Sequence, residues 1–158
     1  MEEIHEKFMK MAIDLSRTGM VQGKGGPFGC VIIKDGKVVG QGCNSVLDTN
    51  DPTAHAEVVA IRDACKNLGS FQLEGCYLYT SCEPCPMCLG AIYWARPERV
   101  FFANTKKDAA AIGFDDQFIY EELELPLNKR KIPFSQLSKK EANQVFKEWV
   151  LLDNKTLY

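Results

Sequence analysis

Two cysteines in the stretch TSCEPCPMC, residues 80–88, have the spacing of metal ligands. Cys85 and Cys88 are separated by about one turn of a predicted helix, so their side chains point the same way. Zinc prefers thiolate and imidazole ligands. The unpaired N–H groups and the dipole at a helix start lower the pKa of a thiol, and Pro84 and Pro86 suit such a start. These two cysteines are therefore candidate zinc ligands.

Cys82 stands three residues before Cys85 but is not expected in the same helix. Pro84 favours an extended conformation for the residue before it, which leaves Cys82 at the end of the preceding strand. Three protein ligands leave one corner of a zinc tetrahedron for water, which is typical of a catalytic site, whereas a fourth ligand closes the site. We predict the open, three-ligand site. The alternatives are a closed structural site that includes Cys82 and a row of buried cysteines without metal.

The third ligand is expected from TAHAEVVA, residues 53–60. His55 begins another predicted helix, and Glu57 follows two residues later. In the first turn of a helix both side chains can reach a common point beyond the helix end, one as a ligand and the other beside it. Zinc lowers the pKa of water from ~16 towards ~7, and a neighbouring carboxylate can transfer the proton. The alternative for Glu57 is an ordinary acid favoured by the helix dipole.

Helices and strands alternate around these motifs. Apolar residues at helical spacing predict a first helix that ends at Gly19. Asp35-Gly36 lies between two β-rich runs and predicts a two-residue hairpin. The stretch CYLYT predicts a strand before the cysteine helix, and RVFFA predicts a strand after it. The buried face of the helix after His55 is expected to contain Val58, Ile61, Cys65 and Leu68.

The C-terminal part is expected to end in one more helix. Ser138 and Glu141 are three residues apart and predict a capping box at its start. No repeats or linkers interrupt the chain, so residues 1–158 are predicted to form a single domain. The alternation of elements predicts an α/β fold with helices on both sides of a sheet.

The composition is typical of one globular domain and argues against a dedicated nucleic-acid or membrane partner. The chain has 158 residues, of which 46% are apolar and 25% charged, and its formal net charge is -2. Proteins dedicated to nucleic acids usually have a basic surface. No apolar run is long enough to cross a bilayer, and the charged N-terminus does not resemble a signal peptide. We therefore expect a reduced, cytoplasmic location, where clustered cysteines more often indicate metal binding or catalysis than disulfides.

The segments 55–57 (HAE) and 84–88 (PCPMC) together resemble the zinc-dependent nucleobase deaminases of the cytidine deaminase superfamily. The segments GGPFG, NDPTAHAE, YTSCEPCPMCLGAIYWAR and AIGFDD are similar to the bacterial guanine deaminases, and the likeness covers nearly the whole chain. The resemblance implies a three-layer α/β/α sandwich around a mixed five-stranded sheet. It also implies hydrolysis of a purine base, guanine, to xanthine and ammonia. One Zn²⁺ per subunit is expected on His55, Cys85 and Cys88, with Glu57 as the catalytic proton-transfer group.

The resemblance implies a second group of residues around the purine. Asn44 matches a base-binding asparagine, Phe28 an aromatic residue that stacks on the base, and Asp116 a carboxylate that contacts the purine. Trp94 is expected behind or beside the pocket. Each of these residues has an alternative without a substrate. Asn44 would bond its own loop, and Phe28 would be a core aromatic residue. Asp116 would be a solvated acid, and Trp94 would pack in the core.

The resemblance further implies a homodimer. The C-terminal segment, residues 126–158, is expected to be exchanged between two subunits and to cover the partner's active site, where Tyr158 would reach the pocket. The alternative is a helix that folds back on its own subunit. The alternative functions are those of a tRNA adenosine deaminase, a cytosine-type deaminase, and a zinc-stabilised interaction module without catalysis.

Overall fold

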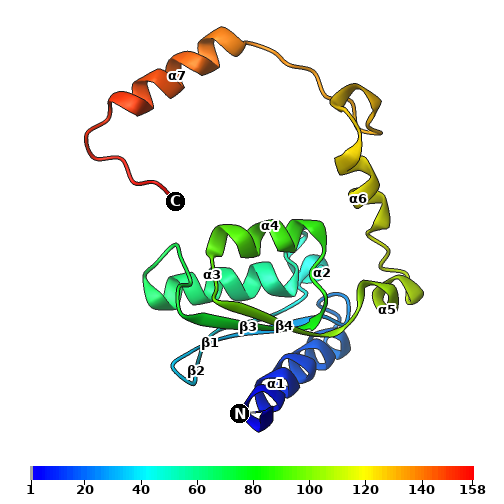
Figure 1. The fold of residues 1–158 in the computed structure, drawn as a ribbon. Coiled ribbons are helices and arrows are strands. Elements are labelled where there is room, and N and C mark those ends of the chain that lie inside the picture. The colour runs from blue at the N-terminus through cyan, green and yellow to red at the C-terminus, as the bar shows by residue number, and fades with distance from the viewer. Residues whose placement is uncertain (1) are drawn as a thin grey trace. The chain divides into compact units, whose positions relative to one another are not determined.

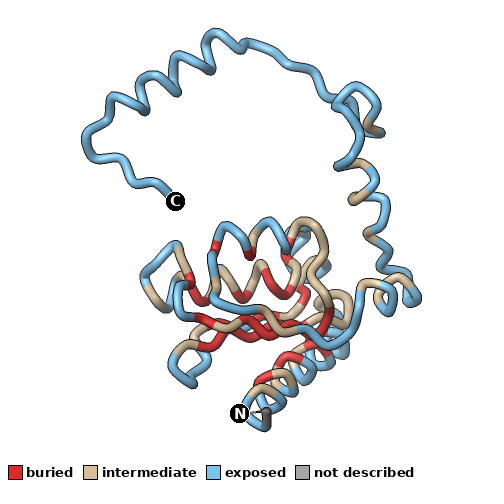
Figure 2. Tube along the Cα trace, in the orientation of Figure 1, coloured by how far each residue is buried: buried red, intermediate tan, exposed pale blue. Residues whose placement is uncertain are grey.

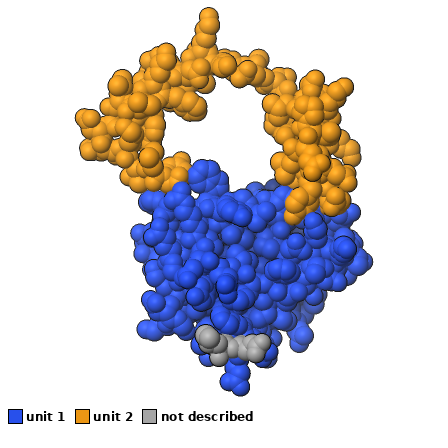
Figure 3. Space-filling model, in the orientation of Figure 1, with its two compact units in different colours: residues 1–116 blue, residues 117–158 orange. Residues whose placement is uncertain are grey.

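The computed structural model describes residues 2–158 and divides into two units, residues up to Asp116 and residues 117–158 (Figure 3). The helices of the first unit are α1 (Glu2–Val21), α2 (Val46–Thr49), α3 (Ala56–Leu68), α4 (Pro86–Ala95) and α5 (Lys106–Ala111). Its strands are β1 (Gly29–Lys34), β2 (Lys37–Cys43), β3 (Cys76–Cys82) and β4 (Arg99–Asn104).

The strands described in the chain form one mixed sheet in the order β2-β1-β3-β4. β1 pairs antiparallel with β2 and with β3, whereas β3 pairs parallel with β4 across a connection through α4. Asp35 and Gly36 have positive φ angles of 49° and 73° and close the predicted hairpin. The expectation of five strands is wrong, since this sheet has four. After β4 the described chain continues into helices, and Pro126 and Pro133 disfavour a further strand.

Helices cover both faces of the sheet, which confirms the predicted three-layer α/β/α sandwich. α1 packs on one face, and α3 and α4 lie side by side on the other (Figure 1). The core between the sheet and the α3–α4 layer includes Ile32 and Leu78, and the core beneath α1 includes Phe8 and Tyr79. The residues predicted to bind zinc stand in the α3–α4 layer, at the starts of its two helices.

The buried face of α3 is made mostly of small residues. Its buried residues are Ala56, Glu57, Ala60 and Ala64. The predicted stripe is confirmed only in part, because Ile61, Cys65 and Leu68 pack against the core but, like Val58, are half-buried and not fully buried. The reason is the close approach of β2, because a Cβ atom on Gly40 would lie 2.5 Å from Cβ of Ala64 and 2.6 Å from the carbonyl oxygen of Ala60. Alanines are the residues that fit this contact.

Gly40→Ala is expected to lower the free energy of unfolding by ~1–3 kcal/mol, because the added methyl group overlaps the backbone of α3. Gly90→Ala in α4 is the matched control. A Cβ atom there meets no atom within 4 Å, and alanine is favoured over glycine in a helix by ~1 kcal/mol. Urea unfolding measures both variants. Equal stability of the Gly40 and Gly90 variants would contradict the packing of α3 on β2.

One helix boundary and one helix cap differ from the predictions. α1 continues through Gly19 to Val21, and Gly23, with φ of 70°, lies just beyond its end. A Cβ atom on Gly19 would lie 2.8 Å from the Cβ and Sγ atoms of Cys43, so this glycine permits close packing and does not end the helix. Ser138 has a left-handed backbone, with φ of 49°, and makes no side-chain capping bond, so the predicted capping box is absent.

The second unit contains α6 (Gln117–Glu124), the 3-10 turn η1 (Leu127–Lys129) and α7 (Lys139–Leu151). None of its residues is buried (Figure 2). Its exposed apolar side chains include Phe118, Phe134, Phe146 and Trp149. This unit therefore has apolar side chains but no core of its own. In residues 2–158 no helix combines the length and the apolar character that a membrane span requires.

Candidate metal centre

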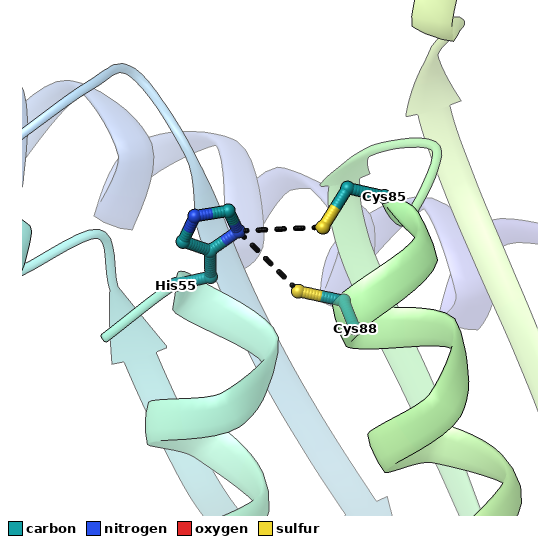
Figure 4. A group of neighbouring side chains, drawn as sticks. All are labelled: His55, Cys85 and Cys88. Carbon is teal, nitrogen blue, oxygen red and sulfur yellow. Dashed lines mark hydrogen bonds between the residues drawn. The ribbon is translucent and has the colours of Figure 1, made fainter. Parts of the chain in front are cut away.

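His55, Cys85 and Cys88 lie together at the starts of two helices, and Figure 4 shows their side chains pointing toward one another. Nδ1 of His55 is 3.5 Å from Sγ of each cysteine, and the three donor atoms all lie within 4.8 Å of one another. His55 is the N-cap of α3 and Cys85 is the N-cap of α4, both with extended backbone. The structure thus brings together the three residues predicted as ligands.

This set of donors fits one zinc ion. One imidazole and two thiols are donors that zinc prefers, and two helix starts that converge on one point favour thiolate charge. Two hydrogen bonds lower the pKa of Cys85 to about 4, and the bond with Cys88 has a larger effect than the bond with His55. The same bond to Cys85, together with burial, raises the pKa of Cys88. Both cysteines bind zinc as thiolates, so metal binding releases the protons that they carry.

Glu57 is buried beside the three donors. It lies in the first turn of α3 and is 6% exposed. Its Oε1 accepts a hydrogen bond from the hydroxyl of Thr80 at 3.0 Å, and its Oε2 accepts one from Sγ of Cys88 at 3.3 Å. Burial raises the pKa of Glu57. The residue predicted as the catalytic acid is thus a buried carboxylate in contact with a candidate metal ligand, and not a solvated acid of the helix start.

Cys82 lies apart from this group. It is buried at the end of β3, and its Sγ donates a hydrogen bond to the carbonyl oxygen of Thr105 at 3.6 Å. Burial raises the pKa of Cys82 to about 11. Within the part of the chain that the structure describes, the donor group consists of His55, Cys85 and Cys88.

Asn44 and Phe28, predicted to bind the base, are linked through the backbone. The N–H of Asn44 donates to the carbonyl oxygen of Phe28 at 2.9 Å. Asn44 is 5% exposed, and its Oδ1 accepts a hydrogen bond from the N–H of Val46 at 3.3 Å. Phe28 is half-buried and packs edge-on against Phe114, with ring centroids 5.0 Å apart. Asn44 thus bonds its own loop, and Phe28 packs against another aromatic ring, as the alternatives without a substrate describe. Their roles toward the base stay predictions.

The other three predicted substrate residues have different surroundings. Asp116 is half-buried at the end of the first unit, where burial, with a contribution from the negative charge of Cys85, raises its pKa. Trp94 is 64% exposed on α4, outside the core of the first unit, and Tyr158 is 70% exposed in the second unit. Their roles also stay predictions.

Two residues at the site were missed by the sequence reasoning. Thr80 donates to Glu57, and the signal for it is a polar residue at a strand position that shares a face with buried Leu78. A Cβ atom on Gly25 would overlap Oδ1 of Asn44 and lie 2.9 Å from its Cγ. The paired glycines of GGPFG are the signal for that close approach.

Comparison with known proteins identifies relatives over the whole chain. The profile described as the cytidine and deoxycytidylate deaminase zinc-binding region matches residues 2–104. Over 154 residues the chain is 56% identical to guanine deaminase of Bacillus subtilis (strain 168), which covers 98% of this chain and 99% of the relative. The X-ray structure of guanine deaminase from Bacillus subtilis gives a TM-score of 0.95 and 56% identity over 98% of each chain. A tRNA-specific adenosine deaminase of Aquifex aeolicus is 34% identical over 145 residues, 91% of this chain and 92% of the relative.

The matched region contains every residue of the donor group together with Glu57. The resemblance to bacterial guanine deaminases is confirmed by an identity that extends well beyond the two short motifs. The zinc-binding character of the matched region agrees with one imidazole and two thiols that fit one zinc ion. The chain therefore belongs to the zinc-binding family of cytidine and deoxycytidylate deaminases.

Proposed function

We propose that the protein is a zinc-dependent hydrolase that converts guanine to xanthine and ammonia. One observation carries this proposal: the buried carboxylate of Glu57 lies against a three-donor zinc site. A fold that matches the Bacillus subtilis enzyme with a TM-score of 0.95 surrounds this site and supports guanine as the substrate. The identity to tRNA-specific adenosine deaminases is lower, and the formal net charge of -2 does not favour a polyanionic substrate.

The reaction needs a nucleophile and two proton transfers. Zinc held by His55, Cys85 and Cys88 would lower the pKa of water, so that hydroxide is available near neutral pH. Glu57 accepts the first water proton and delivers it to the ring nitrogen N3 as the oxygen bonds to C2. Glu57 then carries the second proton to the amino group, the C2–N bond breaks, and ammonia leaves as the C2 carbonyl forms. Such proton transfer contributes ~10²–10⁴-fold in rate.

The substrate residues complete the proposal. The amide of Asn44 offers one donor and one acceptor to the purine edge, and the ring of Phe28 offers a face for the base. Asp116, whose raised pKa reflects burial near the donor group, would contact the purine and assist in handling the amine proton. We assign Trp94 to the surroundings of the pocket and Tyr158 to the pocket of a partner subunit.

Gly25→Ala is expected to raise KM for guanine about tenfold or more and to change kcat less. The added methyl group overlaps the side-chain oxygen of Asn44 and displaces the amide that we assign to the base. A displacement equivalent to ~1.4 kcal/mol of substrate binding gives a tenfold change. Gly23→Ala is the control for an alanine in the same loop, because a Cβ atom there meets nothing within 4 Å, and its φ of 70° adds backbone strain that the Gly25 variant does not have. Steady-state kinetics of both variants provide the check, and an unchanged KM for the Gly25 variant would remove Asn44 from the base site.

We also propose that the protein is a cytoplasmic homodimer in which residues 126–158 are exchanged between subunits. The second unit supports this, since it exposes Phe134, Phe146 and Trp149 and buries none of its residues. Burial of such side chains against a partner subunit would stabilise the dimer by ~1.5–3 kcal/mol each. A segment that covers the pocket would also exclude water during the reaction.

Removal of the chain after Pro126 is expected to abolish dimerisation and guanine deamination together. Light scattering of the truncated and full-length proteins reports the molecular mass, and ammonia release reports activity. The variant Lys147→Ala, which alters an exposed residue of α7 inside the same segment, is the control. A fully active truncated monomer would contradict the exchange.

The substrate assignment is tested with four substrates at equal zinc loading. Guanine, adenine, cytosine and an anticodon stem-loop are each incubated with the full-length protein, and the ammonia released is measured. The proposal predicts release from guanine. Release confined to the stem-loop would assign the protein to the tRNA adenosine deaminases, and release confined to cytosine would assign it to a cytosine-type activity.

A further inference from the structure

The carboxylate of Glu57 is held by a residue from the sheet behind it. We propose that Thr80 of β3 is a positioning residue that fixes Glu57 in the orientation needed for proton transfer. This inference rests on the proposed function, because it assigns Thr80 a role through the group that moves the protons. Thr80 is not itself expected to contact the substrate or the metal ion.

Thr80 is built into the core. It is 1% exposed, and its backbone pairs with Cys30 at the end of the antiparallel β1–β3 ladder and with Phe102 in the parallel β3–β4 ladder. From this rigid position its hydroxyl donates to Oε1 of Glu57 at 3.0 Å. A buried hydroxyl without a partner is unfavourable, so the bond fixes both groups. The sheet thereby determines where the first turn of α3 presents its carboxylate.

The hydrogen bond from Thr80 to Glu57 becomes more important when Cys88 serves as a zinc ligand. Two hydrogen bonds to the Glu57 carboxylate are described, one from Thr80 and one from Sγ of Cys88. A cysteine binds zinc as the thiolate, so Cys88 then has no proton to donate. Among residues 2–158, Thr80 is the side chain that continues to donate to Glu57 in that state.

The two carboxylate oxygens then have separate tasks. Oε1 is occupied by the hydroxyl of Thr80, which leaves Oε2, on the side of the metal ligands, to accept and release protons. A carboxylate free to rotate would spend less time in the geometry for transfer, and small misplacements of a catalytic group lower rates strongly. Loss of the Thr80 hydroxyl therefore acts on kcat and leaves KM and zinc content unchanged.

Thr80→Val and Thr80→Ser form a matched pair for the test. Valine keeps the shape and β-branching of threonine without the hydroxyl, and serine keeps the hydroxyl. Thr80→Val is expected to lower kcat for guanine about tenfold, the equivalent of one hydrogen bond, with KM and one zinc ion per subunit retained. Thr80→Ser is expected to stay within about threefold of the unaltered protein. Wild-type kcat in Thr80→Val, or equal losses in both variants, would overturn the proposal.

Two further measurements separate this inference from the proposed function. In a Glu57→Gln background, Thr80→Val is expected to have no additional effect on the residual rate, because both changes act through one group. Additive losses would overturn the positioning role. A crystal structure of Thr80→Val is expected to show the Glu57 carboxylate turned or in two conformers, and an unmoved carboxylate would also overturn it. If the unaltered protein releases no ammonia from guanine, the proposed function fails, and the crystal structure still tests the positioning role.

Discussion

Glu57→Gln is expected to lower kcat for guanine deamination by ~10²–10⁴-fold while the protein keeps one zinc ion per subunit. Glutamine has nearly the volume of glutamate, so the side chain still fits a position that is 6% exposed. Its amide oxygen can still accept the hydrogen bond from Thr80. What the amide lacks is the ability to take up and release a proton. The variant therefore isolates proton transfer from packing.

The measurement combines ammonia release with zinc content determined by mass spectrometry. Glu98→Gln is the control, because it makes the same chemical change at an exposed position near the start of β4. A Glu57→Gln protein of unaltered activity would show that another group carries the proton. Loss of the zinc ion together with activity would instead show that Glu57 supports metal binding.

Cys85→Ser is expected to reduce zinc content from about one ion per subunit to near none and to abolish deamination. Serine lacks the thiolate that zinc prefers, and Sγ of Cys85 lies 3.5 Å from Nδ1 of His55 within the donor group. At zinc concentrations 100 to 1,000 times the Kd, loss of binding removes ~3–4 kcal/mol of stability. Thermal unfolding with and without added zinc, together with zinc analysis, provides the measurement.

Cys82→Ser is the matched control for Cys85→Ser. Both change one sulfur to oxygen in the same segment, but the Cys82 thiol donates to Thr105 and stands outside the donor group. The Cys82 variant is expected to retain its zinc ion and at least half of its activity. Zinc loss in the Cys82 variant at the level of the Cys85 variant would indicate a closed, structural site.

The chemistry of the site was predictable because its signals are local. Cys85 and Cys88 are one helical turn apart, and His55 and Glu57 share the first turn of α3, so spacing alone predicts each pair. The hairpin at Asp35-Gly36 was predictable for the same reason. That the two helices lie side by side with both starts at one point depends on the fold, which the resemblance supplied and the spacing did not.

Features that depend on contacts between distant segments were not predictable. The buried face of α3 consists mostly of alanines because Gly40 of β2 approaches the helix closely. The sequence of α3 itself contains no sign of that contact. The hydroxyl of Thr80 meets Glu57 only after β3 and α3 have packed together. The apolar pattern of α3 predicted that the larger side chains of Ile61 and Leu68 form its buried face, but both are only partly buried.

The two possible capping boxes show how a local pattern depends on backbone conformation. Thr105 and Asp108 exchange both capping hydrogen bonds at the start of α5, where Thr105 has extended backbone. Ser138 and Glu141 have the same spacing, but Ser138 adopts a left-handed conformation and makes no cap. Side-chain capping requires an extended N-cap residue, so the same sequence pattern succeeds at one helix and fails at the other.

The central claim is that two sulfur atoms and one imidazole nitrogen of this chain hold zinc and leave a position for the reaction. X-ray absorption at the zinc edge of the fully loaded protein tests it most directly, because Zn–S distances of about 2.3 Å are distinct from Zn–N and Zn–O distances near 2.0 Å. We expect two sulfur neighbours and two nitrogen or oxygen neighbours, unchanged in Cys82→Ser. Three sulfur neighbours that fall to two in Cys82→Ser would contradict the account.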